Sequence, residues 1–283
     1  MDRVAVRLRG GAAGGERGFA LLVVLWSMAL LALLGTHVVA SGRAEILLAS
    51  NLRGAAAAEA AADGAVHAAI FRLLDPSPRR WVPDGLPREL ALPSGGIAEV
   101  RVESEQGKLN PNLARAEVLR SLLTQLGAEP RTAASLAVAI LDWRSGSQRP
   151  RPGGAKEPQY RAAGRDYAPP GRPFQSIDEL GLVLGMTPAL LARLSPFLSI
   201  YQSGEPDPRF AHPLVLLAVR EGGGDAEADA EFGGDTGGAL VVAITVTASA
   251  AGGARFVRQA HVRLGAGTRG RPWQILDWRR LEG

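Results

Sequence analysis

The sequence has no cysteine among its 283 residues, and this absence excludes disulfide bonds, thiolate metal sites and cysteine nucleophiles. Histidine is scarce too, and its few copies lack the short spacings of a zinc site: His37, His67, His212 and His261. No nucleophile elbow, phosphate-binding loop or zinc-protease motif occurs either. The sequence therefore predicts that the protein is not an enzyme.

Charged residues are missing from one long stretch near the N-terminus. No Asp, Glu, Lys or Arg lies between Phe19 and Gly42. At 1.5 Å per residue, a helix over this stretch would be roughly 36 Å long, enough to cross a bilayer's hydrocarbon core. The residues before it are net basic, which favours a cytoplasmic N-terminus. We predict a single membrane span with the bulk of the chain outside the cytoplasm.

The rest of the chain has the composition of a folded α+β protein. Hydrophobic residues make up 46% of the sequence, enough for a core, and the formal net charge of only +4 is no signature of nucleic-acid binding. Alanine dominates from Arg43 to Leu74 without proline, so the N-terminal helix should continue to Asp75, before Pro76. Alternating apolar residues at 97–104 predict the first strand.

Two stretches with the same pattern bracket the middle of the chain. Asn110-Pro111 opens the first and Asp207-Pro208 the second, and each pair predicts a helix N-cap followed by proline in the first turn. Between them, helices are expected over 132–146 and, as a short pair, within 174–201. Strands are expected over 239–248, 254–264 and 272–278, whereas the glycine-rich acidic stretch 221–238 cannot pack a core.

The basic leader that ends in Gly18, followed by Phe19 and an uninterrupted apolar helix, resembles the class III signal of type IV pilin-like proteins. That resemblance implies cleavage by prepilin peptidase between Gly18 and Phe19, and methylation of the new amine of Phe19. An ordinary single-pass anchor is the alternative. Most relatives carry a glutamate at the fifth mature position, where this chain has Val23. Valine there needs no partner amine in the subunit ahead, which suits the first subunit of a fibre.

The order of an Asp-Trp pair, a Gly-Ala-Lys-Glu segment and a later Phe-Gln-Ser-Ile-Asp-Glu segment resembles the minor pseudopilin K family of type II secretion systems. The resemblance implies a pilin-like long N-terminal helix packed on an antiparallel sheet, with an inserted all-helical domain. The expected segments are a prepilin leader over 1–18, the transmembrane half of the helix over 19–42 and its periplasmic half over 43–75. The pilin-like α+β domain is divided into 76–106 and 202–283, and the inserted helical domain covers 107–201.

The same resemblance implies a function and its partners. A member of this family would cap and help initiate the periplasmic pseudopilus, supporting export of folded proteins across the outer membrane. It would sit in the bacterial inner membrane, with its N-terminus in the cytoplasm and its bulk in the periplasm. Its expected partners are the other minor pseudopilins, the major pseudopilin, prepilin peptidase and the inner-membrane secretion platform.

Relatives in this family can bind calcium through acidic residues after the Asp-Trp pair. Here only Asp142 and Glu157 remain of such a set, whereas Ser145, Ser147 and Lys156 stand where acidic residues would be needed. Calcium takes six to eight oxygen ligands, often from several carboxylates. We therefore expect no cofactor, with Asp142 and Glu157 as the residual candidates for a calcium site.

The stretch 144–173 is rich in arginine, and it supports an alternative function. The stretch contains seven basic residues and only two acidic ones, Glu157 and Asp166. A membrane-tethered periplasmic module could therefore use the helical insertion to capture nucleic acid or a substrate. The insertion lacks the Gly-hydrophobic-Gly turn of DNA-binding helical hairpins. We expect no nucleic-acid partner, and an acidic partner protein fits this stretch better.

Overall fold

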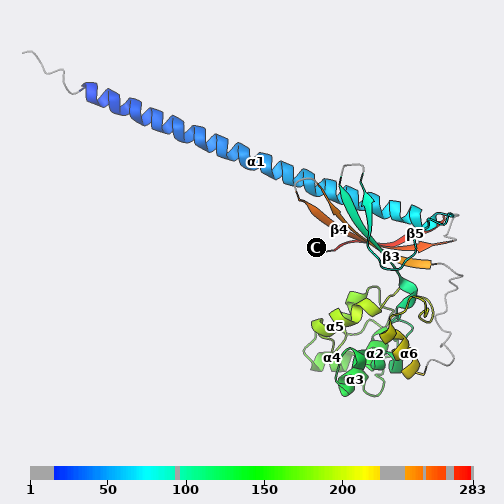
Figure 1. The fold of residues 1–283 in the computed structure, drawn as a ribbon. Coiled ribbons are helices and arrows are strands. Elements are labelled where there is room, and N and C mark those ends of the chain that lie inside the picture. The colour runs from blue at the N-terminus through cyan, green and yellow to red at the C-terminus, as the bar shows by residue number, and fades with distance from the viewer. Residues whose placement is uncertain (1–15, 93–95, 224–239, 251–252, 266–270, 282–283) are drawn as a thin grey trace, which may run out of the picture.

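A computed structural model describes residues 16–92, 96–223, 240–250, 253–265 and 271–281 (Figure 1). One long helix, α1 (Glu16–Leu74), projects far beyond the rest of the protein, and its C-terminal part packs on an antiparallel sheet. A group of short helices lies on the side of the sheet away from α1. This arrangement confirms the predicted fold class, a pilin-like long helix on an antiparallel sheet with an inserted helical region.

The long helix is continuous over 59 residues, because alanine and leucine fill it and no proline interrupts it. It ends at Leu74, one residue before the predicted end at Asp75, since Pro76 cannot donate the backbone hydrogen bond that would extend it. Its contact with the sheet begins near Ala58, and the residues before that point extend away from the body of the protein (Figure 1). The helix thus has a bare N-terminal part and an anchored C-terminal part.

The sheet has five strands in the order β1-β2-β3-β4-β5, and every neighbouring pair is antiparallel. The strands are β1 (Arg88–Ala91), β2 (Ile97–Ser104), β3 (Leu240–Ser249), β4 (Arg255–Leu264) and β5 (Trp273–Leu281). Strand β2 alternates strictly between exposed and buried side chains, as its sequence predicted. Strand β1 was not expected, because its four residues lie in the proline-rich connector after α1.

One face of the sheet packs on α1. Val100 and Val102 of β2 and Ile244 of β3 are fully buried there against Ala62 and Val66 of the helix. Alanine on the helix allows the two backbones to approach closely, while the branched side chains of the strands fill the remaining space. A second hydrophobic core, formed by the short helices, lies apart from this one.

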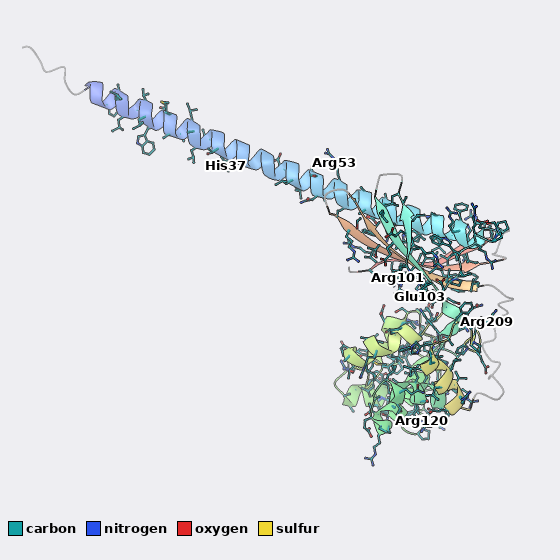
Figure 2. All side chains as sticks on the ribbon, in the orientation of Figure 1. His37, Arg53, Arg101, Glu103, Arg120 and Arg209 are labelled. Carbon is teal, nitrogen blue, oxygen red and sulfur yellow. The ribbon has the colours of Figure 1, made fainter. Side chains whose placement is uncertain are left out.

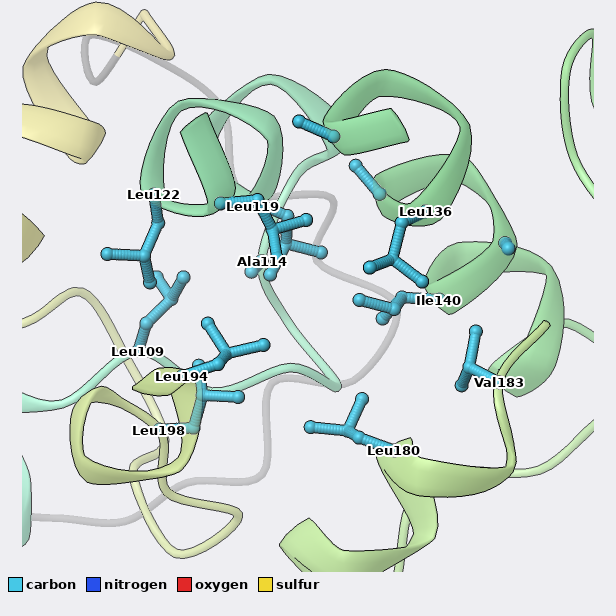
Figure 3. Packing of buried hydrophobic residues seen from close by; sticks show 14 of the residues in the cluster. Leu109, Ala114, Leu119, Leu122, Leu136, Ile140, Leu180, Val183, Leu194 and Leu198 are labelled. Atoms are coloured by element: carbon cyan, nitrogen blue, oxygen red, sulfur yellow. The ribbon is translucent and has the colours of Figure 1, made fainter. Parts of the chain in front are cut away.

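The helical region contains α2 (Ala116–Gln125), α3 (Pro130–Arg144), α4 (Glu157–Ala162), α5 (Pro188–Leu194) and α6 (Pro213–Glu221). The 3-10 turns η1 (Glu105–Gly107), η2 (Ile177–Leu182) and η3 (Ser195–Phe197) link these helices to each other and to the sheet. Leu119, Leu122, Leu136 and Ile140 lie at the centre of its core (Figure 3). Helix α4 was not expected, because its six residues fall in the arginine-rich stretch 144–173, for which the sequence predicted no helix.

Helix α6 belongs to this helical core, which corrects the predicted boundary at residue 201. Its Val215 and Ala218 are buried in the same cluster as α2, although the sequence assigned all of 202–283 to the pilin-like part. The apolar face of α6 packs on α2 and is buried in the helical core. The insertion therefore reaches at least to Glu221.

The two similar stretches form the same local structure, though neither begins with the predicted helix cap. The Asn110 side chain accepts a hydrogen bond from the Asn112 amide, and the Asp207 side chain accepts one from the Arg209 amide. Each residue opens a turn, and the helix starts only six residues later, at Ala116 in α2 and at Pro213 in α6. The predicted caps at Asn110 and Asp207 are therefore wrong, because both side chains close a turn on the backbone two residues ahead.

Parts of two predicted segments lie outside the described residues. Most of the predicted leader, residues 1–15, is among them, and so is the acidic stretch 221–238 from residue 224 onward.

Candidate functional site

The predicted processing site lies at the start of α1. The helix begins at Glu16, so the Gly18–Phe19 bond falls in its first turn. The Phe19 side chain is 71% exposed and that of Val23 is 45% exposed. None of the residues that the structure describes buries these two side chains, so they are open to lipid or to another helix. Cleavage and methylation at this position stay predictions.

A single apolar segment of α1 meets the requirements of a membrane span. Among the described residues, one helix is long and apolar enough to cross a bilayer, and its apolar window covers Phe19–His37 with a mean hydropathy of 2.3. None of that window is buried inside the protein. Figure 2 shows the side chains of this part of α1, up to His37, standing free of the rest of the molecule.

Beyond this window α1 carries a second exposed apolar surface. Leu47, Leu48 and Leu52 are 64%, 60% and 62% exposed, and they lie between the membrane window and the first contact with the sheet. Exposed leucines on a helix that stays outside the bilayer are unfavourable in water unless a partner covers them. We call Leu47, Leu48 and Leu52 the leucine patch, and it is suited to packing against another apolar helix.

A cluster of charged residues fixes the helical region to the sheet. Glu105 of η1 is almost fully buried, and its Oε1 accepts a hydrogen bond from Lys108 Nζ at 2.7 Å. His261 of β4 lies beside it, with Nε2 3.9 Å from the same oxygen and Nδ1 3.3 Å from Asp277 Oδ2. The His261 ring lies against Tyr201, with ring centroids 4.6 Å apart and an interplanar angle of 33°. These contacts join the sheet to two segments of the helical region, one at η1 and one just after η3.

Burial controls the protonation of this cluster. Loss of water around the ring lowers the pKa of His261 below its ordinary value, and the nearby carboxylate of Glu105 only partly opposes that effect. The pKa of Tyr201 is raised, because burial and the charge of Asp277 disfavour the phenolate. The neutral forms of both rings are therefore favoured at the junction.

Asp142, the first candidate calcium ligand, is fully buried at the end of α3. Its Oδ1 accepts a hydrogen bond from Arg151 Nη1 at 3.0 Å, and its Oδ2 accepts one from the Arg151 amide at 3.1 Å. Gly154 lies directly against this carboxylate, since a Cβ atom on Gly154 would come within 2.1 Å of Asp142 Oδ2. The chain from Ser145 to Lys156 is thereby folded back on α3.

Lys156 stands where a calcium site would need an acidic residue, and it closes the same loop at its C-terminal end. Only 5% of the residue is exposed, and Nζ donates to the carbonyl oxygens of Asp142 at 2.5 Å and Ser145 at 2.6 Å. Burial lowers the pKa of Lys156, and the charge of Asp142 opposes that shift. The ammonium group sits at the C-terminal end of α3, where helix carbonyls favour a cation.

This arrangement does not fit a calcium ion. The two oxygens of Asp142 are occupied by Arg151, and a lysine ammonium already lies on the nearby carbonyl oxygens. Glu157, the second candidate ligand, is exposed and pairs with Arg161 one turn later in α4. No group of three or more potential metal-ligating side chains occurs in the part of the chain that the structure describes.

Several basic residues of the predicted loop are engaged within the protein. Arg144 donates to the carbonyl oxygens of Pro111 and Ala114, and Lys156 is buried as described above. Further ion pairs join Arg151 to Asp142, Arg161 to Glu157 and, at 3.7 Å, Arg172 to Glu179. These contacts tie the helical region together and weaken the alternative that the basic stretch captures nucleic acid.

Residues 97–203 match the family described as type II secretion system protein K. Two curated relatives carry the same name. The protein of Klebsiella pneumoniae is 36% identical over 83 residues, which are 29% of this chain and 26% of that protein. The protein of Dickeya chrysanthemi is 31% identical over 85 residues, 30% of this chain and 23% of that protein. The aligned segments thus span about a quarter of each relative.

The fold is similar to a solved structure. A chain in the crystal structure of the GspK-GspI-GspJ complex from the type 2 secretion system of enterotoxigenic Escherichia coli superposes with a TM-score of 0.55. The superposition covers 86% of this chain and 99% of that chain, and the sequences are 15% identical. At this identity the likeness concerns the fold alone.

Proposed function

We propose that this chain, whose residues 97–203 belong to the type II secretion system protein K family, is a minor pseudopilin of such a system. The observation that carries the proposal is the place of this family segment. It forms one strand and most of the helical insertion of a pilin-like fold whose long helix is bare in its N-terminal part. The role is structural, and no catalytic step is part of it.

The two exposed apolar surfaces of α1 support anchoring followed by assembly. The window Phe19–His37 would hold the chain in the inner membrane with the sheet and the helical region in the periplasm. Prepilin peptidase would cut between Gly18 and Phe19 before assembly. The leucine patch would then pack against the long helices of other minor pseudopilins and of the major pseudopilin, which removes leucine surface from water.

Val23 and the insertion support a position at the tip of the fibre. A subunit without the usual buried carboxylate needs no partner amine ahead of it, as expected for the first subunit. The helical region lies across the sheet from α1 (Figure 1) and adds bulk that would hinder stacking beneath another subunit. We therefore place the chain at the tip, where it would cap the pseudopilus and help to initiate it on the inner-membrane platform.

Labelling of isolated pseudopili tests this proposal. A small epitope would be inserted into the chain and detected by immunogold microscopy, and the major pseudopilin would carry the same epitope as a control. Label at one end of each fibre is the expected result for this chain, and label along the shaft is expected for the control. Label along the shaft for both proteins would contradict a tip position.

A further inference from the structure

The end of α3 carries a group of oxygen atoms that binds a cation. Three groups meet there: the carbonyl oxygens of Asp142 and Ser145 and the Lys156 ammonium, while the carboxylate of the same Asp142 is bonded by Arg151. The oxygens form a cradle of the kind that attracts a cation, and they lie at the negative end of a helix. The cation that these oxygens bind is the ammonium group of Lys156, a side chain of the protein itself.

We propose that Lys156 is the resident cation of this cradle and that its ammonium closes loop 145–156 on α3 without any metal ion. Two hydrogen bonds to carbonyl oxygens, at 2.5 and 2.6 Å, hold the ammonium in place. Arg151 neutralises the Asp142 carboxylate from the side that solvent can reach, since its side chain is 47% exposed and that of Asp142 is fully buried. Lys156 at the end of the loop thus bonds the carbonyl oxygens, and Arg151 in its middle bonds the carboxylate.

Closure of the loop has a consequence for the core. Lys156 directly precedes α4, and its amide donates to Gln159 Oε1, so the ammonium and the start of the helix are fixed together. Tyr160 in that helix is fully buried and accepts a hydrogen bond from the Leu184 amide. The lysine therefore positions α4 and the aromatic group around Trp143 in the helical core.

Thermal unfolding of the detergent-solubilised full chain tests the proposal. The wild type is expected to have the same Tm, within about 1 °C, in millimolar calcium and in EDTA. Lys156→Met keeps the aliphatic stem and removes the ammonium, and it should lower Tm by about 4–8 °C in both buffers. Arg149→Met, at an exposed position of the same loop, is the matched control and should leave Tm unchanged.

A chemical rescue separates the charge from the shape of the side chain. The chain has no cysteine, so Lys156→Cys introduces a unique thiol. Alkylation of the unfolded variant with bromoethylamine rebuilds a lysine-like ammonium, whereas iodoacetamide adds a neutral group of similar length. After refolding, the aminoethylated protein should regain most of the lost Tm and the neutral adduct should not.

Three results would overturn the proposal. The first is a wild-type Tm that rises with calcium, the second is a Lys156→Met variant as stable as the wild type, and the third is equal recovery with both alkylating agents. If neither adduct refolds, hydrogen exchange of the wild-type amides 145–156 decides the matter. Protection that is equal in calcium and EDTA supports the proposal, and protection that needs calcium contradicts it.

Discussion

Arg258 of β4 donates a hydrogen bond from Nε to Asp63 Oδ1 of α1 at 2.7 Å, and this contact ties the long helix to the centre of the sheet. A second donor of the same guanidinium, Nη2, reaches Glu59 Oε1 at 2.8 Å, one turn earlier on α1. The guanidinium also lies over the rings of Phe256 and Trp278. Together with the buried apolar face of α1, this side chain fixes the rotation of the helix on the sheet.

Arg258→Met should weaken the attachment of α1. The Arg258 side chain is 8% exposed, but Asp63 and Glu59 are 37% and 51% exposed, so solvent screens part of the interaction. We expect the free energy of unfolding to fall by about 2 kcal/mol. Chemical denaturation measures it, with Arg255→Met at the exposed end of the same strand as the control. Equal effects of the two substitutions would exclude a specific role for Arg258.

The buried His261 should make the protein less stable in mild acid. Its folded pKa is lowered, so the unfolded chain takes up this proton first as the pH falls through about 6.5, and the free energy of unfolding then decreases. The groups that face the ring are Glu105, Asp277, Arg279 and Tyr201, and Lys108 in turn bonds Glu105. The slope from this residue can reach about 1.4 kcal/mol per pH unit until the folded pKa is passed.

Denaturant titrations between pH 7.5 and pH 5 check this dependence. His261→Gln should flatten the curve below about pH 6.5. His67→Gln, which removes a histidine outside this cluster, is the control substitution. An unaltered curve for His261→Gln would assign the acid sensitivity to other groups.

Leu52→Asp in the leucine patch should impair assembly without unfolding the protein. The side chain is 62% exposed in the isolated chain, so the substitution removes little packing there. In a helix bundle it would lose the burial of a leucine and place a charge against apolar neighbours, which weakens binding by about tenfold or more. Co-purification with the other minor pseudopilins measures this loss, and Asn51→Asp is the matched control. Normal co-purification of Leu52→Asp would rule out the leucine patch as a contact.

Two glycine substitutions should have opposite effects. Gly154→Ala places a methyl group against the buried Asp142 carboxylate and should destabilise the helical region by about 1–3 kcal/mol. Gly64→Ala lies in α1 with open space around it and should stabilise the isolated chain by about 0.5–1 kcal/mol. Calorimetry of both variants tests the pair. Stabilisation by Gly154→Ala would show that the loop does not pack as described.

Long periodic segments and strict alternation were predicted well from the sequence. The end of α1 at Leu74 and the bounds of β2 follow from proline placement and from a period of two, which act locally. The resemblance to the protein K family is confirmed over residues 97–203. Strand β1 and helix α4 were missed, because four and six residues carry too little periodicity to stand out from proline- and glycine-rich surroundings.

Contacts between distant segments could not be predicted in the same way. The sequence indicated a helix cap at Asn110, but its side-chain amide donates to the carbonyl oxygen of Gln202, 92 residues further along the chain. From the sequence, Lys156 indicated only that a calcium site is unfavourable, because the backbone carbonyl oxygens that it binds have no signature in the sequence. The pairing of Arg258 with α1 likewise joins residues far apart along the chain.

The mature N-terminus tests the central claim most directly. The chain would be isolated from cells with and without prepilin peptidase, and its N-terminal peptide identified by mass spectrometry. We predict a methylated Phe19 at the N-terminus when the peptidase is present and an intact leader when it is absent. An intact leader in both strains would contradict the assignment as a pseudopilin and leave an ordinary membrane anchor.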